Sequence, residues 1–316
     1  MARILFIAIG YYGYTDRIAE EMRAQGHRVD ARLIEDPGFW SKTAKRFAPA
    51  VYRRRLEAYH AGLIRESGGT RYDQVVFLQA HQMSDANLSA LRTTQPQARF
   101  VLYNWDSLTT HDYAPVLGHF DKAATFDPAD AATLGIDYLP LFALPEYFAV
   151  AAAPTTPDYD LYFVGSMHST ARYEAVRRLA DHCAATGLRL KLYLHCSPPR
   201  AIRLLREGKW MQGMTLRSIG TDGILAMMRR SRAVFDFANH RQSGYTMRFV
   251  ENLCAGRKIV ATNPRLADEP FFTPDRFMLT PDLDFSGLAA FLDAPAPSPG
   301  DFQRFSLATW VGRLLG

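Results

Sequence analysis

The stretch that decides the fold is AVFDFANHRQSGYTMRFVENLCAGRKIVATN, which runs from Ala233 to Asn263. Its pattern predicts a strand, a polar loop, a helix and a second strand. β-branched and aromatic residues come first, the segment 240–244 is polar, the helix extends to about Ala255, and Lys258 opens the next apolar run. A strand that leads through a polar loop into a helix is the basic unit of an α/β fold.

The predicted helix has signals at both ends. Ser243 and Thr246 offer hydroxyls that can cap its start, and Gly256 supplies the residue that tolerates the left-handed backbone at its end. The free N–H groups and the positive dipole end of the helix face the polar loop, so this loop can hold a phosphate. Arg248 and Glu251 lie three positions apart on the helix and can pair with each other.

Alternation of strands and helices extends outward over the whole chain. Arg3–Gly10 is a near-continuous apolar run, Asp16–Gln25 reads as a helix, and His27–Ile34 alternates as a second strand. This βαβ unit implies a parallel sheet. The stretch 145–158 has the alanine, threonine and proline content of a linker, and DLYFVG (160–165) restarts the alternation.

Length and composition agree with a two-domain α/β protein. The chain has 316 residues, more than one core usually supports, with 48% hydrophobic and 22% charged residues. We predict domains at 1–150 and 151–316, and the final helix, near 303–315, is a candidate to pack back on the first domain. No apolar run approaches the roughly 20 residues of a membrane span, and no signal sequence is evident, so a cytoplasmic location is expected.

Cysteine and charge usage exclude some classes of function and leave others open. Three cysteines without CxxC spacing, at Cys183, Cys196 and Cys254, are expected to be buried thiols rather than metal ligands or disulfides. The net charge is +5, and basic residues gather in Lys45–Arg55 and Arg200–Lys209. Such clusters suit anionic lipid, phosphorylated ligands or nucleic acid, but they are also typical of solvated helix faces.

The order of these segments resembles the two-domain glycosyltransferases of the GT-B architecture, in particular bacterial enzymes of cell-surface polysaccharide biosynthesis (lipopolysaccharide, capsule and exopolysaccharide). DLYFVGS (Asp160–Ser166) and SGYTMRFVENLCAGRKIVATN (Ser243–Asn263) carry the resemblance. It implies two Rossmann-like α/β domains facing a central cleft, a nucleotide-sugar substrate, no separate cofactor and a metal-independent reaction. A commoner form of the motif has Glu-Pro in the loop and a second acidic residue one turn earlier. Here His240, Arg241 and Arg248 stand nearby, so the retaining mechanism of that form is not implied.

The resemblance places the donor in the second domain. It puts the diphosphate against the loop and helix N-terminus and the ribose against Glu251. Arg248 can bind phosphate oxygens with its guanidinium fork, or it can simply pair with Glu251. Gly165 and Ser166 follow a strand at the sheet edge where open α/β folds bind ligands, although Gly165 also fits a turn. The predicted donor-binding residues are Gly165, Ser166, His240, Gly244, Tyr245, Thr246, Arg248 and Glu251.

The first domain is expected to bind the acceptor. Tyr11, Tyr12 and Gly13 follow the first strand without a GxGxxG pattern, and the tyrosines can stack on a sugar or merely cover the end of the sheet. An inverting transfer needs a base for the acceptor hydroxyl. Asp106 and His81 follow two other strands and are our first and second candidates. The alternatives are a turn residue for Asp106 and a structural histidine for His81.

No GxSxG, GxxxxGK[ST] or HExxH motif is present, and Asp282-Leu-Asp284 reads as a turn rather than a metal site. We therefore predict a glycosyltransferase that moves a sugar from a nucleotide-sugar donor to a glycan, lipid-linked or small-molecule acceptor. The alternatives are a nucleotide-sugar epimerase of the same architecture and a non-catalytic sugar- or nucleic-acid-binding protein. Peripheral contact of the Lys45–Arg55 segment with the inner face of a membrane is a further hypothesis, and a nucleic-acid partner is not expected. Donor base, sugar and stereochemical outcome stay open.

Overall fold

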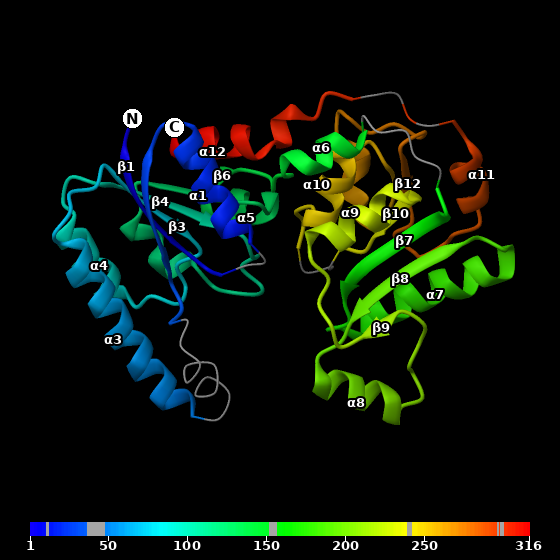
Figure 1. Cartoon of the computed structure of the whole chain (residues 1–316), viewed down its shortest axis with the longest axis horizontal. Coiled ribbons are helices and arrows are strands. Elements are labelled where there is room, and N and C mark those ends of the chain that lie inside the picture. Colours follow the sequence, from blue (N-terminus) through cyan, green and yellow to red (C-terminus); the bar gives the residue numbers. More distant parts are fainter. Residues whose placement is uncertain (11–12, 37–47, 152–156, 239–241, 296, 298–299) are drawn as a thin grey trace. The chain divides into compact units, whose positions relative to one another are not determined.

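The computed structural model describes residues 1–10, 13–36, 48–151, 157–238, 242–295, 297 and 300–316. The chain folds into two compact units. Unit 1 comprises Met1–Pro140 and Leu307–Gly316, and unit 2 comprises Leu141–Ser306. Each unit holds a six-stranded sheet with flanking helices (Figure 1), and every pairing between neighbouring strands is parallel. The two Rossmann-like α/β domains predicted from the sequence are confirmed.

The sheet of unit 1 has the strand order β2-β1-β3-β4-β5-β6. Its strands are β1 Arg3–Ala8, β2 Arg28–Leu33, β3 Gln74–Leu78, β4 Arg99–Asn104, β5 Lys122–Thr125 and β6 Asp137–Tyr138. Its helices are α1 Tyr14–Ala24, α3 Pro49–Ser67, α4 Asp85–Thr94, the 3₁₀ helix η1 Ala114–His119, α5 Pro128–Leu134 and α12 Leu307–Leu315.

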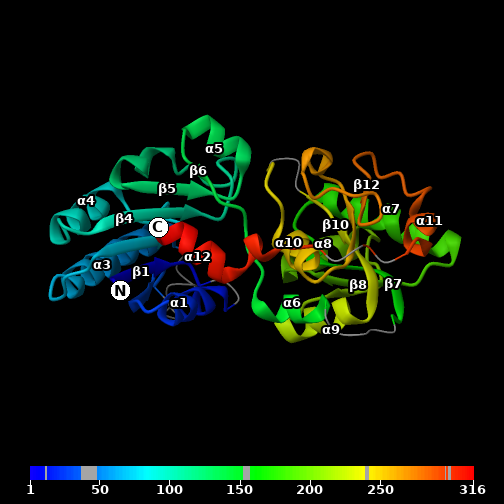
Figure 2. The ribbon, with the colours of Figure 1, turned by 90° about the horizontal axis from the view of Figure 1, so that it is seen from above.

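Helices cover both faces of this sheet, which is why its central strands β1, β3 and β4 are almost entirely apolar and buried. One face packs against α3 and α4, where Phe77 and Leu102 join Leu88 in a buried cluster. α1 and α12 lie on the opposite face (Figure 2). The ring of Trp310 in α12 stands edge-on to Tyr103 of β4, with centroids 4.8 Å apart. The last helix is therefore part of the core of unit 1.

The sheet of unit 2 has the order β12-β11-β10-β7-β8-β9. Its strands are β7 Tyr159–Ser166, β8 Leu190–His195, β9 Met214–Thr215, β10 Ser231–Asp236, β11 Lys258–Ala261 and β12 Phe277–Leu279. Its helices are α6 Pro145–Ala151, α7 Thr170–Thr186, α8 Pro198–Arg206, α9 Thr221–Arg229, α10 Met247–Cys254, the 3₁₀ helix η2 Pro264–Asp268, α11 Leu288–Asp293 and the 3₁₀ helix η3 Gln303–Phe305.

The stretch 145–158, which the sequence pattern reads as a linker, is a helix over its first half. Pro145 is the first residue of α6, where a missing N–H has no cost because the first turn has no partner for it. Tyr147 and Val150 are buried, and α6 packs against α9 and α10 of unit 2. Unit 1 consequently ends at Pro140, whereas the sequence pattern puts the boundary at residue 150.

Local signals elsewhere agree with the structure. Thr246 is the N-cap of α10, and its hydroxyl accepts a hydrogen bond from Phe249 N at 3.0 Å. Gly256 has φ +66°, and the Arg257 N–H bonds back to the Asn252 carbonyl, so the helix ends on the left-handed glycine as predicted. The three cysteines are free and buried, also as predicted.

Candidate functional site

Each sheet has one point where its strand order reverses, and this is where open α/β sheets bind ligands. In unit 2 the reversal lies between β7 and β10, which are hydrogen-bonded neighbours. In unit 1 it lies between β1 and β3. The described members of the predicted site lie at the carboxyl ends of β7 and β10 in unit 2 and of β1, β3 and β4 in unit 1, or in the helix that follows.

A buried carboxyl group lies at the reversal point of unit 2. Asp236 ends β10, and its Oδ1 accepts a hydrogen bond from Thr246 Oγ1 at 2.5 Å. Burial raises the pKa of Asp236 to about 6, while the Thr246 hydroxyl and the positive charges of Arg172 and Arg248 oppose this rise. Arg172 follows β7 and Arg248 follows β10 in the chain, so the fold brings two guanidinium groups toward one carboxyl.

Two arginines hold the loop after β7. Arg172 Nη1 donates to Ser166 O at 3.1 Å and lies 3.3 Å from His168 Nδ1, and Arg200 Nε donates to Met167 O at 3.1 Å. The pKa of His168 is lowered, first by partial burial and then by the positive charge of Arg172. A lowered pKa favours the neutral imidazole, and the positive charge of this loop therefore comes from its arginines.

The residues of α10 are more enclosed than the sequence suggests. Arg248 forms an ion pair with Glu251, whose side chain is fully buried, while that of Arg248 is 19% exposed. The Tyr245 hydroxyl donates to Glu269 Oε1 at 2.8 Å, and the Tyr245 ring stacks on Phe249 with centroids 4.4 Å apart. Tyr245 thus directs its side chain into unit 2, and only its backbone is left to meet a ligand.

Of the remaining predicted donor residues, Gly165, Ser166 and Gly244 lie within the described part of the chain. Gly165 lies within β7, and a Cβ atom there would stand 2.9 Å from Phe163 Cζ, so packing alone requires a small residue. Ser166 is exposed at the end of the same strand, and Gly244 is buried in the loop before α10. His240 lies outside the described residues.

In unit 1 the two candidate bases belong to one cluster. Asp106 Oδ2 accepts a hydrogen bond from Gln79 Nε2 at 2.6 Å and lies 3.8 Å from His111 Nε2. The His111 ring stacks on the His81 ring, with centroids 3.9 Å apart and an angle of 9° between the planes. The carboxylate is 45% exposed, so an incoming hydroxyl can reach it. Asp106 and His81 are therefore joined through His111.

Backbone geometry fixes this cluster. Gln79 has φ +64°, a conformation that is costly for a residue with a side chain and that concentrates at functional sites. Its N–H still bonds to the Tyr103 carbonyl of β4 at 2.9 Å, so the strained residue directly continues the sheet. The His111 N–H bonds to the Ser107 carbonyl at 3.1 Å, which turns the loop after β4 back toward Asp106.

The predicted acceptor loop lies only partly within the described residues. Gly13 has φ +79° and is the N-cap of α1, a left-handed position that favours glycine. Tyr11 and Tyr12 lie outside the described residues. The proposed stacking of these tyrosines on a sugar therefore stays a prediction.

Sequence reasoning missed four residues that the fold places in these clusters: Arg172, Arg200, Gln79 and His111. A weak signal existed for Arg172, because it stands three residues after Ser169, whose side chain caps α7 and accepts from the Arg172 N–H at 3.2 Å. For the others, the pairing of distant strands and the path of the loops that follow them bring the side chains to the site.

The described residues include no group of three or more His, Cys, Asp or Glu side chains that could hold a metal ion. Asp284, part of the Asp-Leu-Asp stretch, accepts a hydrogen bond from Ser286 N at 2.9 Å, as a turn residue does. Within the same described ranges, no helix has the length and hydropathy of a membrane span.

Two Rossmann-like units, each with polar residues at the reversal point of its sheet, define the fold as that of the GT-B glycosyltransferases. A scan against protein-family models and a search of curated proteins both return no match. Solved structures do match. AviGT4, a glycosyltransferase involved in avilamycin A biosynthesis, is 15% identical with a TM-score of 0.63, and the match covers 100% of this chain and 96% of AviGT4.

The lipopolysaccharide outer core galactosyltransferase WaaB is also 15% identical, with a TM-score of 0.58 and coverage of 98% of this chain and 97% of WaaB. A UDP-GlcNAc 2-epimerase from Neisseria meningitidis, solved with UDP-GlcNAc, is 7% identical with a TM-score of 0.59, and 99% and 98% of the two chains are covered. At these identities the likeness establishes the fold, and the activity has to be argued from the site.

Proposed function

We propose that this protein is a glycosyltransferase that moves a sugar from a nucleotide-sugar donor to a glycan, lipid-linked or small-molecule acceptor. One observation carries the proposal: Arg172 and Arg248 approach the buried Asp236 at the reversal point of the unit 2 sheet. A nucleotide diphosphate is the leaving group of such a transfer, and it needs positive charge and helix-terminal amides to stabilise it.

The donor would bind to unit 2. Its diphosphate would lie between the loop that Arg172 holds and the N-terminus of α10, near Gly244 and Thr246. Glu251 would hydrogen-bond the ribose, as the family resemblance implies. Because this carboxylate is buried against Arg248, donor binding is expected to open the ion pair, freeing the guanidinium for phosphate and the carboxylate for the ribose.

The acceptor would bind to unit 1, where Asp106 would act as the base in an inverting transfer. Gln79 would hold the carboxylate in place by its hydrogen bond. After Asp106 has taken the acceptor's proton, the neutral His111 ring would move closer than its present 3.8 Å and accept a hydrogen bond from the carboxylic acid. His81 would be the second candidate for the base. Proton transfer of this kind is typically worth 10²–10⁴ in rate.

A lipid-linked acceptor would place the protein at the inner face of a membrane, as a cytoplasmic, peripherally attached enzyme. Arg53, Arg54 and Arg55 of α3, the described end of the basic segment 45–55, are exposed, which is the minimum that the predicted contact of this segment requires. The nucleotide sugar is a substrate in this proposal, and no separate cofactor is invoked.

The experiment is a thermal-shift panel of UDP, GDP, CMP and dTDP on the wild type and on Arg172→Gln. A nucleotide at a hundred times its dissociation constant stabilises by about 2.7 kcal/mol, and the shift should shrink in the variant. Arg177→Gln, an exposed arginine of α7 in the same unit, is the matched control. Stabilisation by no nucleotide, or equal shifts in all three proteins, would contradict the donor site.

Incubation with the stabilising nucleotide's sugar conjugates then separates the enzyme classes. A transferase releases nucleotide only when it has an acceptor or water to receive the sugar. Isomerised nucleotide sugar without any added acceptor would instead identify an epimerase. Binding without turnover, even with glycan, lipid-linked and small-molecule acceptors added, would identify a non-catalytic protein.

A further inference from the structure

Exposed apolar side chains gather on one segment of unit 2. Among the described residues, six large hydrophobic side chains are exposed, and four of these fall between residues 202 and 216. Basic residues accompany them. We call this set the α8 surface: Ile202 (51% exposed), Leu205 (57%), Trp210 (41%) and Leu216 (55%), with Arg203, Arg206, Lys209 and Arg217.

Helix α8 separates its side chains into three stripes, because residues three apart lie on one side of a helix. Ala201 and Leu204 are buried in the core of unit 2, Ile202 and Leu205 are exposed and apolar, and Arg203 and Arg206 are exposed and basic. The apolar stripe lies between the buried stripe and the basic one. An exposed apolar stripe bordered by a basic one is what a helix needs to lie in the boundary between water and lipid.

The α8 surface is a built feature with a defined backbone. The N–H of Gly208 bonds to the Leu205 carbonyl at 3.1 Å, and the N–H of Lys209 bonds to the Leu204 carbonyl at 2.8 Å. These two bonds and the φ of +64° at Gly208 form the helix-ending turn that glycine permits. The turn leads the chain from α8 directly into Lys209 and Trp210.

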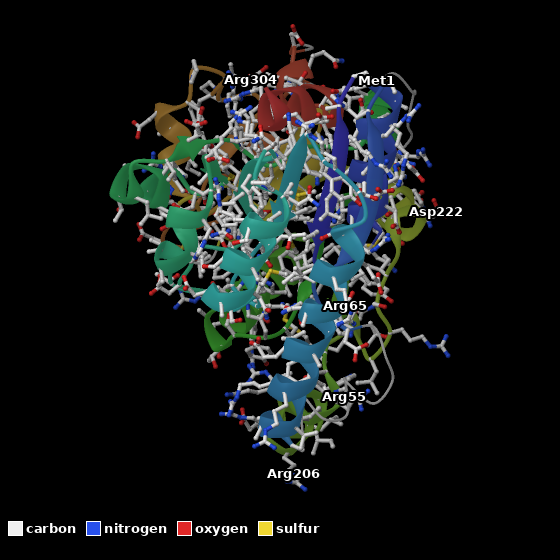
Figure 3. The ribbon with its side chains drawn as sticks, turned by 90° about the vertical axis from the view of Figure 1, so that its left-hand side faces the viewer. Met1, Arg55, Arg65, Arg206, Asp222 and Arg304 are labelled. Atoms are coloured by element: carbon white, nitrogen blue, oxygen red, sulfur yellow. The ribbon has the colours of Figure 1, made fainter. Side chains whose placement is uncertain are left out.

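The segment Pro198–Arg217 contains five cationic residues and one carboxylate, so its formal charge is +4. The carboxylate, Glu207, is shared by Arg203 Nε at 2.7 Å and Lys209 Nζ at 3.1 Å. α8 stands away from the other helices of unit 2, beyond the edge strand β9 (Figure 1), and Arg206 lies at its tip with the side chain extending outward (Figure 3).

We propose that the α8 surface docks onto the surface of an anionic lipid bilayer. Ile202, Leu205 and Trp210 would enter the boundary between headgroups and acyl chains, a depth that tryptophan favours. Arg203 and Arg206 would meet the lipid phosphates. A second copy of this chain fits the surface poorly, because a two-fold contact would bring two patches of charge +4 face to face.

The basic part of α3 lacks the apolar component of such a surface. Its described residues expose one large hydrophobic side chain, Val51, beside Arg53, Arg54 and Arg55. We therefore assign the membrane contact to α8 in unit 2 rather than to α3 in unit 1. The inference does not depend on the transferase activity, because lipid binding requires no sugar donor.

The test is co-sedimentation of the full chain with vesicles of phosphatidylcholine plus phosphatidylglycerol, and with phosphatidylcholine alone. Arg203→Gln/Arg206→Gln should weaken binding to the anionic vesicles by about 30-fold, as about fivefold for each arginine near such a surface implies. Arg177→Gln/Arg178→Gln on α7 removes the same charge from another exposed helix of unit 2 and should leave binding unchanged.

Ile202→Ser/Leu205→Ser tests the apolar stripe and should weaken co-sedimentation with the anionic vesicles. Tryptophan fluorescence of the protein with and without vesicles is a second test. The chain has four tryptophans. Trp105 and Trp310 are buried and so are shielded from lipid, and in a Trp40→Phe variant any change on adding vesicles therefore comes mainly from Trp210. The emission of Trp210 should shift to shorter wavelength with anionic vesicles. Circular dichroism and thermal unfolding check that each variant folds.

Several results would overturn the proposal. These are absence of binding to anionic vesicles, equal loss in the α7 control, or loss only after Arg53→Gln/Arg54→Gln/Arg55→Gln on α3. A concentration-dependent dimer that Ile202→Ser/Leu205→Ser abolishes would instead identify the surface as a contact between copies of the chain.

Discussion

Replacing Asp236 by asparagine should stabilise the protein at neutral pH. The wild-type carboxyl is buried, and its pKa of about 6 lies above the ordinary value of 3.8. At pH 7 the folded protein therefore carries a charge that burial disfavours. A difference of about two pKa units corresponds to about 3 kcal/mol. Asparagine has the same shape, carries no charge, and its oxygen can still accept the hydrogen bond from Thr246.

The sign of the pH dependence follows from proton binding. The folded protein binds the Asp236 proton more tightly than the unfolded chain, so the wild type loses stability as the pH rises from about 4 to about 6. The variant has no such loss at this residue. Its advantage should be close to zero near pH 4, grow through the interval and level off above about pH 7. The positive charges of Arg172 and Arg248 already hold the pKa of Asp236 down to about 6, so the value of about 3 kcal/mol includes their attraction.

The measurement is thermal unfolding of the wild type and of Asp236→Asn at a series of pH values between about 4 and about 8. Thr246→Val is a useful companion, because it removes the α10 cap and should destabilise by about 1 kcal/mol near pH 4. Its cost should grow as the pH rises, because it also removes the hydrogen bond that stabilises the charged Asp236. A stability difference that does not change with pH, or a variant less stable than wild type at pH 8, would refute the reasoning. Either result would mean that Arg172 and Arg248 fully compensate the buried charge.

Three single substitutions and one double variant probe the clusters. Asp106→Asn should lower kcat by about 10²–10⁴ while leaving nucleotide-induced stabilisation intact, and near-wild-type turnover would exclude Asp106 as the base. His111→Phe keeps a ring against His81 but removes the nitrogen near Asp106; we expect a shifted pH–rate profile with KM little changed, and an unaltered profile would leave His111 a packing role only. Glu251→Gln breaks a buried ion pair and should destabilise by about 3 kcal/mol, measured by thermal unfolding. Glu251→Gln/Arg248→Met, which removes both charges, should recover part of that loss, and no recovery would contradict the pairing.

Much of the fold could be predicted because its signals are local. Apolar runs such as Arg3–Ala8 indicate strands buried on both faces, and the cap at Thr246 and the left-handed Gly256 bound α10 wherever it packs. The same local reasoning failed at Pro145. A proline in an alanine-rich stretch suits a linker or a first helical turn equally, and only the packing of α6 on α9 and α10 decides between them.

Part of the candidate site was also readable, since residues that follow parallel strands meet at one edge of the sheet. That rule identified Asp106 and His81 and the loops after β7 and β10. It could not show that His111 stacks on His81, or that a left-handed Gln79 holds Asp106, because both depend on the path of a loop.

The sequence by itself therefore determined two α/β units and the approximate place of their ligand edges, because strand and helix periodicity and cap chemistry act over a few residues. Only the tertiary structure decided which side chains share a site. Arg172 and Arg248 are 76 positions apart in the chain and approach Asp236 because β7 and β10 are neighbours in the sheet. It also decided that Glu251 is enclosed by its ion pair while Ile202 and Leu205 stay exposed. Burial is a property of packing between distant segments, and no local pattern specifies it.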